Sequence, residues 1–179
     1  MDAAGGSDDL ATREKMGVQF DKQRLLAAVI ARVEAKVAEL KAGYGAARDA
    51  VLSTPHVMKS KREVFGQESA YLANALALNI QEREHELKLL RGLRLPENPE
   101  RVALGCLVGV GESGEAIEGL YLILPVCGGM GVPVESGGSP VRIVTPQTPV
   151  AKALLGKSVG DEVPLPTTPP HATAVLLLR

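Results

Sequence analysis

The sequence predicts an α+β protein in which a long antiparallel helical hairpin precedes a small domain of short strands with one short helix. Two observations lead to this prediction. Between residues 20 and 95, apolar residues recur every three or four positions, the spacing of one helix face. After residue 100 this spacing disappears, glycine and proline become frequent, and the apolar runs shorten to strand length. We therefore expect two structural units joined near residue 100.

The first helix is expected to begin at Asp21, whose carboxylate can accept hydrogen bonds from free backbone N–H groups, with Phe20 packing on Leu25. Pro55 should end it. Gly43 and Gly45 weaken it by about 1 kcal/mol each, which favours a bend. Its apolar face is predicted to consist of Leu26, Val29, Val33, Val37, Leu40, Tyr44, Ala47 and Val51.

The second helix is expected to begin at Ser60, which forms a capping box with Glu63, and to stop at Gly92 before Pro96. Its predicted apolar face is Leu72, Leu76, Ile80, Leu87 and Leu90. Two helices of about 31 residues, roughly 46 Å each, would then pack as an antiparallel coiled coil. The exposed tip falls at residues 53–62.

The predicted organisation is a disordered tail at residues 1–16, the hairpin at 17–95, a linker at 96–100 and the C-terminal domain at 101–179. The strands of the C-terminal domain are predicted at residues 101–110, 116–124, 141–144, 162–165 and 172–178, with a helical turn at 149–155.

Composition excludes several functions. A net charge of −1 argues against a broadly basic nucleic-acid binder, and five aromatic residues are too few for a base-stacking surface. Cys106 and Cys127 fit neither a redox pair nor a zinc site, so two reduced core thiols are expected. The sequence shows no signal peptide and no apolar run long enough to span a membrane, which predicts a cytoplasmic protein.

Two segments match nucleotide-binding motifs but lack sequence features that such sites require. Residues 109–114 fit G-x-G-x-x-G, but no long helix can follow them, so a hairpin turn is expected. Residues 151–158 resemble a phosphate-binding loop that lacks its first glycine. The isolated His56, His85 and His171 have no partners at metal-ligand spacing. We therefore predict no catalytic residue, metal or cofactor.

Residues 140–161 resemble the C-terminal domain of the GreA/GreB transcription factors. The matching features are Thr148-Pro149, the ALLGK run at residues 153–157, and Gly160-Asp161. The order of parts also matches, and residues 67–73 (QESAYLA) resemble a sequence found after the tip in one subgroup. The resemblance covers residues 20–179.

The resemblance implies that the C-terminal domain is FKBP-like and docks at the rim of the secondary channel of bacterial RNA polymerase. The coiled coil would reach down that channel, and the nucleic acid of the elongation complex would be contacted only indirectly. The residues that the resemblance assigns to docking are Pro149, Lys152, Leu154, Leu155, Gly156, Lys157 and Asp161.

The tip departs from the family. Cleavage-competent members carry two acidic tip residues that hold a second Mg²⁺, whereas residues 53–62 contain no carboxylate. His56, Lys59, Lys61 and Arg62 are instead predicted to contact the polymerase active centre. Asp49 and Glu68 are expected about two turns back from the apex on opposite helices. Whether they or Glu63 can replace the missing acids stays open.

The expected function is therefore regulation of transcription elongation without stimulation of transcript cleavage. The alternative is a coiled-coil interaction module with another partner. A peptidyl-prolyl isomerase is disfavoured, because its pocket is lined with aromatic residues and Tyr121 is the only one beyond residue 100. The sequence leaves open the oligomeric state and whether the effect on transcription is activating or inhibitory.

Overall fold

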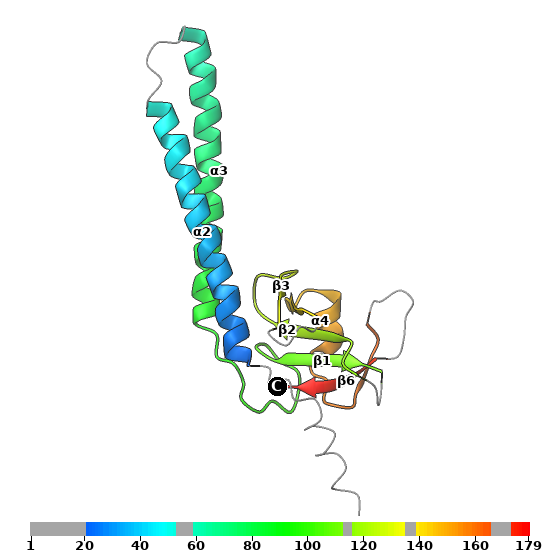
Figure 1. The fold of residues 1–179 in the computed structure, drawn as a ribbon. Helices are drawn as coiled ribbons and strands as arrows, with labels where there is room; N and C mark the ends of the chain where they lie inside the picture. Colours follow the sequence, from blue (N-terminus) through cyan, green and yellow to red (C-terminus); the bar gives the residue numbers. More distant parts are fainter. Residues whose placement is uncertain (1–20, 53–58, 113–115, 135–138, 166–172) are drawn as a thin grey trace, which may run out of the picture.

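The computed structural model describes residues 21–52, 59–112, 116–134, 139–165 and 173–179, with side chains left out at 50–52, 59–67 and 69. The predicted tail, Phe20, most of the tip and His171 lie outside this part of the chain. The described residues form a long helical hairpin beside a mixed sheet, as Figure 1 shows. This confirms the α+β class. No helix among them combines the length and apolarity needed to cross a bilayer.

The first helix of the hairpin, α2 (Lys22–Leu52), begins as predicted. The Asp21 carboxylate accepts hydrogen bonds from the backbone N–H groups of Gln23 at 2.9 Å and Arg24 at 3.3 Å. These bonds satisfy two of the N–H groups that a helix start leaves without partners. The helix continues through Gly43 and Gly45 without a break.

The second helix, α3 (Lys59–Arg91), begins earlier than predicted. Ser60 lies inside the helix, so it is not the residue that caps it, and the expected capping box is wrong. The predicted end is confirmed, because the N–H of Gly92 donates to the carbonyl of Lys88 at 3.1 Å and the helix stops at Arg91.

The seam between the helices matches the prediction along most of its length. Its buried members include Val29, Val33, Val37, Leu87 and Leu90. Leu72 is an error, because it is 53% exposed while Ala73 is half-buried. Counting back from Leu87 in alternating steps of four and three gives Arg83, Ile80, Leu76 and Ala73. The coiled-coil spacing therefore selects the small residue over the larger one beside it.

The two helices are staggered rather than level. Interhelical ion pairs join Glu34 to Arg91 at 2.6 Å and Lys41 to Glu84 at 2.7 Å. Both pairs fit one antiparallel register, which places Leu52 level with about Ala73. From Ala73, α3 continues towards its start at Lys59 for roughly another 20 Å. Figure 1 shows α3 extending past the end of α2.

The sheet has six strands in the order β3-β4-β2-β1-β6-β5. Neighbouring strands are antiparallel, except that β2 and β4 are parallel. The strands are β1 (Leu107–Gly111), β2 (Gly119–Ile123), β3 (Gly131–Val132), β4 (Val141–Val144), β5 (Glu162–Val163) and β6 (Thr173–Leu178). A single short helix, α4 (Pro149–Leu154), follows β4.

Several predicted strands were too long, and β3 was not predicted. The strand expected at residues 101–110 begins only at Leu107, because Gly105 adopts a φ of 85° in a turn that presses against Pro96. A Cβ on Gly105 would lie 2.9 Å from the Pro96 side chain. The strands expected at 116–124 and 162–165 shorten to β2 and β5. Residues 109–111 lie in β1, which pairs antiparallel with β2, as expected if the glycine motif belongs to a hairpin. Residues 113 and 114 of the motif lie outside the described residues.

The sheet has two buried faces, and adjacent residues of β2 alternate between them. Leu120 and Leu122 join the hairpin residues Leu25 and Val29 in one core cluster. Ile123 belongs to a second cluster with α4 on the opposite face. Because successive strand side chains point to opposite faces, one sheet is enclosed by the hairpin base and by α4.

Polar contacts reinforce the junction between the hairpin and the sheet. Arg32 Nη1 donates to the carbonyl oxygen of Gly131, in the edge strand β3, at 2.7 Å. Lys22 Nζ donates to the carbonyl oxygen of Pro96, which links the start of α2 to the segment between the two units. The base of α2 is therefore held both by apolar packing and by hydrogen bonds to the C-terminal half of the chain.

Candidate functional site

The segment that carries the family resemblance forms α4 and the turn after it. Thr148 caps α4, because its Oγ1 accepts a hydrogen bond from the N–H of Ala151 at 3.3 Å and donates one to the carbonyl of Thr145 at 2.8 Å. Pro149 occupies the first helical position, where a missing N–H has no cost. Leu154 is fully buried in the core beneath α4. Leu154 therefore holds α4 on the sheet and offers no surface for docking.

Gly156 ends α4 in a conformation that favours glycine, with a φ of 79°. Its N–H donates to the carbonyl of Val102 at 2.8 Å, and the N–H of Val102 donates to the carbonyl of Lys157 at 2.8 Å. This reciprocal pair attaches the turn to the start of the C-terminal domain. Gly156 and Lys157 are thus positioned by a segment more than fifty residues earlier in the chain.

Asp161 closes the next turn. Its Oδ2 accepts a hydrogen bond from the N–H of Ser158 at 2.8 Å. Its backbone carbonyl accepts one from the N–H of Val175 at 3.0 Å, while the N–H of Gly160 donates to the carbonyl of Val175 at 2.8 Å. Asp161 therefore fixes the course of the chain between α4 and β5, which gives it a structural role whatever the domain binds.

The surface around this segment carries the remaining docking candidates. Pro149, Lys152, Gly156 and Asp161 are exposed, while Leu155 and Lys157 are half-buried. Val159, which the sequence analysis did not single out, is 48% exposed in the same turn. Two lysines and several apolar atoms can contact an acidic protein surface with an apolar centre. That the surface binds polymerase remains a prediction.

The predicted tip residues fall at and before the start of α3. His56 lies outside the described residues, while Lys59, Lys61 and Arg62 lie on the first turn of α3, with their side chains not described. A helix N-terminus carries partial positive charge, so it favours anions and disfavours cations. The basic residues of the tip and the N-terminal end of α3 therefore both contribute positive charge to the tip.

Asp49 and Glu68 do not lie at the same height. The register of the two ion pairs puts Asp49 level with about Leu76, whereas Glu68 is eight residues, or roughly 12 Å, nearer to the start of α3. The two acids lie on opposite helices, as expected, but the stagger of the helices places them at different heights along the hairpin. Carboxylate ligands bind Mg²⁺ at about 2.1 Å, so this axial separation does not suit a shared ion.

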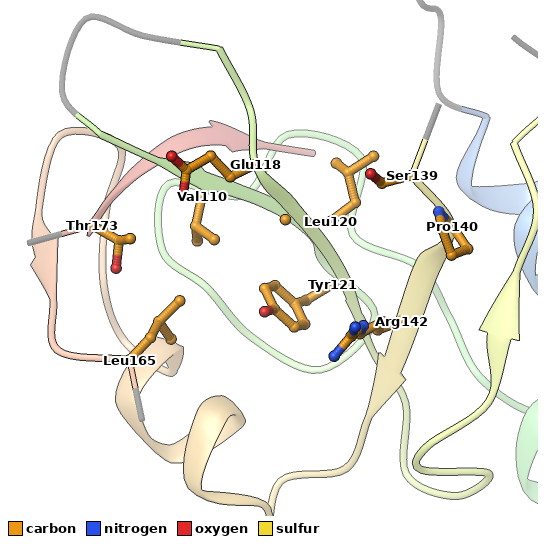
Figure 2. Close-up of a pocket in the computed structure, with 10 residues that line it drawn as sticks. Val110, Glu118, Leu120, Tyr121, Ser139, Pro140, Arg142, Leu165 and Thr173 are labelled. Carbon is orange, nitrogen blue, oxygen red and sulfur yellow. The ribbon is translucent and has the colours of Figure 1, made fainter. Parts of the chain in front are cut away.

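A shallow pocket of about 330 Å³ lies over the sheet. Figure 2 shows Tyr121 and Arg142 pointing into it from adjacent strands, with Leu165 and Thr173 on another side. Tyr121 and Arg142 are directly paired in the β2–β4 ladder. The Thr173 hydroxyl donates to the carbonyl of Val163 at 2.7 Å and is thus occupied. Tyr121 is the single aromatic residue among those that line the pocket.

The two cysteines are free thiols in different settings. Cys106 is fully buried, as predicted for a core thiol, whereas Cys127 is half-buried. Burial, together with the nearby Glu86 carboxylate, raises the pKa of Cys127 to about 11. His85 is exposed. Within the described ranges, no three His, Cys, Asp or Glu residues gather as metal ligands.

Sequence reasoning missed the exposed apolar residues of α3. Tyr71 is 76% exposed and Leu78 is 63% exposed, on a surface where neither is needed for packing. A signal was available, because residues 69–81 contain no charged side chain. A surface helix normally places charged residues on its solvent face.

Comparisons with known proteins give a limited result. No protein-family model matches the chain, and a search of curated proteins finds no match. Among solved structures, the chain is similar to GreA factor homolog 1 (Gfh1) of Thermus thermophilus, with 20% identity over 90% of this chain and 96% of that one and a TM-score of 0.33. A structure described as the transcription factor Gfh1 matches with 20% identity, 90% and 95% coverage, and a TM-score of 0.35. TM-scores of this size do not establish a shared fold.

Proposed function

We propose that this protein is a Gre-like regulator that binds bacterial RNA polymerase at the secondary channel and regulates elongation without stimulating transcript cleavage. The observation that carries the proposal is a long, projecting helical hairpin whose tip segment, residues 53–62, contains basic residues and no carboxylate. The C-terminal resemblance at residues 148–161 supplies the link to the family. The protein would then act in the cytoplasm, without a cofactor.

The dimensions suit a probe that enters a channel while its base stays outside. The 33 residues of α3 extend for roughly 50 Å at about 1.5 Å per residue. The sheet and α4 form a broader body beside the base of α2, which cannot follow the hairpin into a narrow opening. Docking through the surface around Lys152 and Lys157 would then set how far the tip penetrates.

The charge of the tip argues against cleavage activity. Hydrolysis with two metal ions needs several carboxylates close to the reacting phosphate. The tip instead has Lys59, Lys61 and Arg62, with Glu63 directly after them. The nearest acids with described side chains, Asp49 and Glu68, are separated along the hairpin. A basic tip would repel Mg²⁺ and pair with the acidic residues of a polymerase active centre or with the phosphates bound there.

The test is RNA 3′-end cleavage in a backtracked elongation complex that contains a limiting amount of a cleavage-competent Gre factor. We expect excess protein to slow cleavage, because both proteins would compete for one channel. Faster cleavage would contradict the assignment of a non-cleaving tip. An unchanged rate would favour the alternative, a coiled-coil interaction module with a partner other than polymerase.

Matched variants separate the tip from general electrostatics. Lys59→Ala with Lys61→Ala removes two positive charges at the tip. Lys36→Ala with Lys88→Ala removes two from the shaft of the hairpin, the part between the tip and the sheet. We expect the tip variant to compete less well, whereas the shaft variant should behave like the wild type. Equal behaviour of the two variants would remove the proposed contact between the tip and the active centre.

A further inference from the structure

The upper part of α3 contains a band without charge. From residue 69 to residue 81 no side chain is acidic or basic, and we call this segment the neutral band. The ten residues that follow it, 82–91, carry six charges. Before it come Glu68 and the basic tip. The neutral band thus separates two charged parts of one continuous helix.

The neutral band exposes large apolar side chains on its outer face and is apolar along its seam as well. Leu76 and Ile80 face α2 and are half-buried. Tyr71 and Leu78 are seven residues apart, a spacing that puts them on one face, and they are 76% and 63% exposed. Leu72, beside Tyr71, is 53% exposed. Large apolar side chains grouped in this way mark a surface that a partner covers.

We infer that the outer face of the neutral band is a protein-contact surface, and that its occupant is an uncharged, apolar part of the wall of the channel that receives the hairpin. This inference rests on the proposed function and adds a third contact region between the docking domain and the tip. The arrangement of Tyr71, Ala75 and Leu78 at i, i+4 and i+7 is the spacing by which a helix face fills an apolar groove.

Charge excludes nucleic acid as the occupant. Binding to a phosphate backbone depends on lysine and arginine side chains that neutralise phosphates, and the neutral band has neither. Its single aromatic residue, Tyr71, is also too little for a series of stacked bases. An apolar protein surface is the complement that removes Tyr71 and Leu78 from water without leaving a charge buried.

Area argues against a second copy of the chain. Three side chains of this size expose a few hundred Å², on the order of the largest apolar patch of an ordinary monomer. A stable dimer buries roughly 800 Å² on each partner. The neutral band is therefore large enough to add to a contact that has other parts but too small to hold two copies together alone.

The position of the neutral band fits an intermediate contact. Its ends lie ten and twenty-two residues from the start of α3, or about 15 and 33 Å. A channel that takes in about 33 Å of the hairpin from its tip would surround the neutral band. The charged shaft at residues 82–91 lies closer to the sheet, where the channel would open to solvent.

The test measures binding of the full-length protein to RNA polymerase core enzyme by fluorescence anisotropy. Tyr71→Gln combined with Leu78→Gln makes the neutral band polar and keeps good helix formers at both positions. Leu89→Gln is the matched control, because Leu89 lies on the same helix face, 39% exposed, in the charged shaft. Circular dichroism checks helix content, and sedimentation velocity checks the oligomeric state.

We expect the double variant to bind polymerase at least about tenfold more weakly than the wild type, while Leu89→Gln binds like the wild type. Equal binding by all three proteins would overturn the inference and leave the proposed function in place. Failure of all three to bind would overturn the proposed function and this occupant together. A wild type that dimerises, with a monomeric double variant, would make a second copy the occupant instead.

Discussion

The Sγ of Cys127 lies 3.8 Å from Oε2 of Glu86, so a thiol from the sheet half of the molecule meets a carboxylate on α3. Glu86 also binds Arg83, with Nη1 and Oε2 2.7 Å apart. Cys127 adopts a φ of 63°, which is uncommon for a residue with a side chain. The contact keeps the thiol protonated, because burial and the neighbouring negative charge both oppose a thiolate.

Cys127 should therefore react slowly with alkylating agents. With a pKa of about 11, its thiolate fraction at pH 8 is on the order of 100-fold below that of an ordinary cysteine. In a Cys106→Ala variant, where Cys127 is the remaining thiol, iodoacetamide labelling followed by mass spectrometry should show this slow rate, increasing up to about pH 11. A rate equal to that of free cysteine would contradict the assignment.

Substitution of Glu86 provides the companion test. Glu86→Gln removes the negative charge beside the thiol, so the pKa of Cys127 should fall and alkylation at pH 8 should become faster. Glu82→Gln is the control, since Glu82 lies on the same helix with a 66% exposed side chain. If both variants accelerate labelling equally, a general change in net charge rather than the local contact controls the thiol.

The same substitution at two glycines should change stability in opposite directions. Gly156→Ala forces an alanine into a φ of 79° and should destabilise the protein by about 1–2 kcal/mol. Gly43→Ala lies within α2 and should stabilise it by up to about 1 kcal/mol. At both positions a new Cβ would meet no atom within 4 Å, so backbone preference is the cause in each case. Urea unfolding measures both, and a common sign would refute this account.

Two neighbouring leucines of α3 should differ sharply in their effect on stability. Leu90 is fully buried in the core that joins the hairpin to the sheet, whereas Leu89 is 39% exposed. Leu90→Ala should cost about 2–5 kcal/mol of unfolding free energy, through lost burial and a cavity. Leu89→Ala should cost less than about 1 kcal/mol. If thermal unfolding showed similar losses of stability for the two variants, the assignment of Leu90 to the seam and of Leu89 to the surface would be wrong.

The ion pair between Lys41 and Glu84 should be visible in the titration of the glutamate. A hydrogen bond from Lys41 lowers the pKa of the Glu84 carboxyl below its usual range, with its positive charge acting in the same direction. The stabilisation is thus present above the unfolded-state pKa and is lost as the pH falls through the folded-state pKa. NMR titration of Lys41→Met should show a raised Glu84 pKa, and an unchanged value would exclude the pair in solution.

Local sequence signals predicted the hairpin well. Asp21 and Gly92 mark helix ends by hydrogen bonds with neighbours a few residues away, so the chemistry is visible in the sequence. Leu72 was misassigned because an apolar residue one position from Ala73 fits the helical period almost as well. The choice between them depends on the register of two helices, which no short segment determines.

The sheet and the candidate site were predictable only in part. The two residues of β3 form a strand because they pair with β4. A strand of two residues is too short to show the alternation of apolar and polar side chains by which strands are predicted. The turn after α4 was recognised from Pro149 and Gly156, but its reciprocal bonds to Val102 involve a distant segment. The stagger of the hairpin likewise follows from Glu34–Arg91 and Lys41–Glu84, pairs that composition does not reveal.

The core that contains Leu25, Val29, Leu120 and Leu122 has a consequence for how this molecule can be divided. A hairpin expressed without the sheet would expose the apolar side chains at the base of α2. Its aggregation would then result from this exposed core surface and would not indicate a natural binding partner. A hairpin fused to an unrelated domain would need a complementary apolar surface on that domain to cover Leu25 and Val29. The hairpin and the C-terminal domain are therefore not independent folding units, although the sequence suggests two separate parts. A chimeric protein should include the residues of this core from both parts.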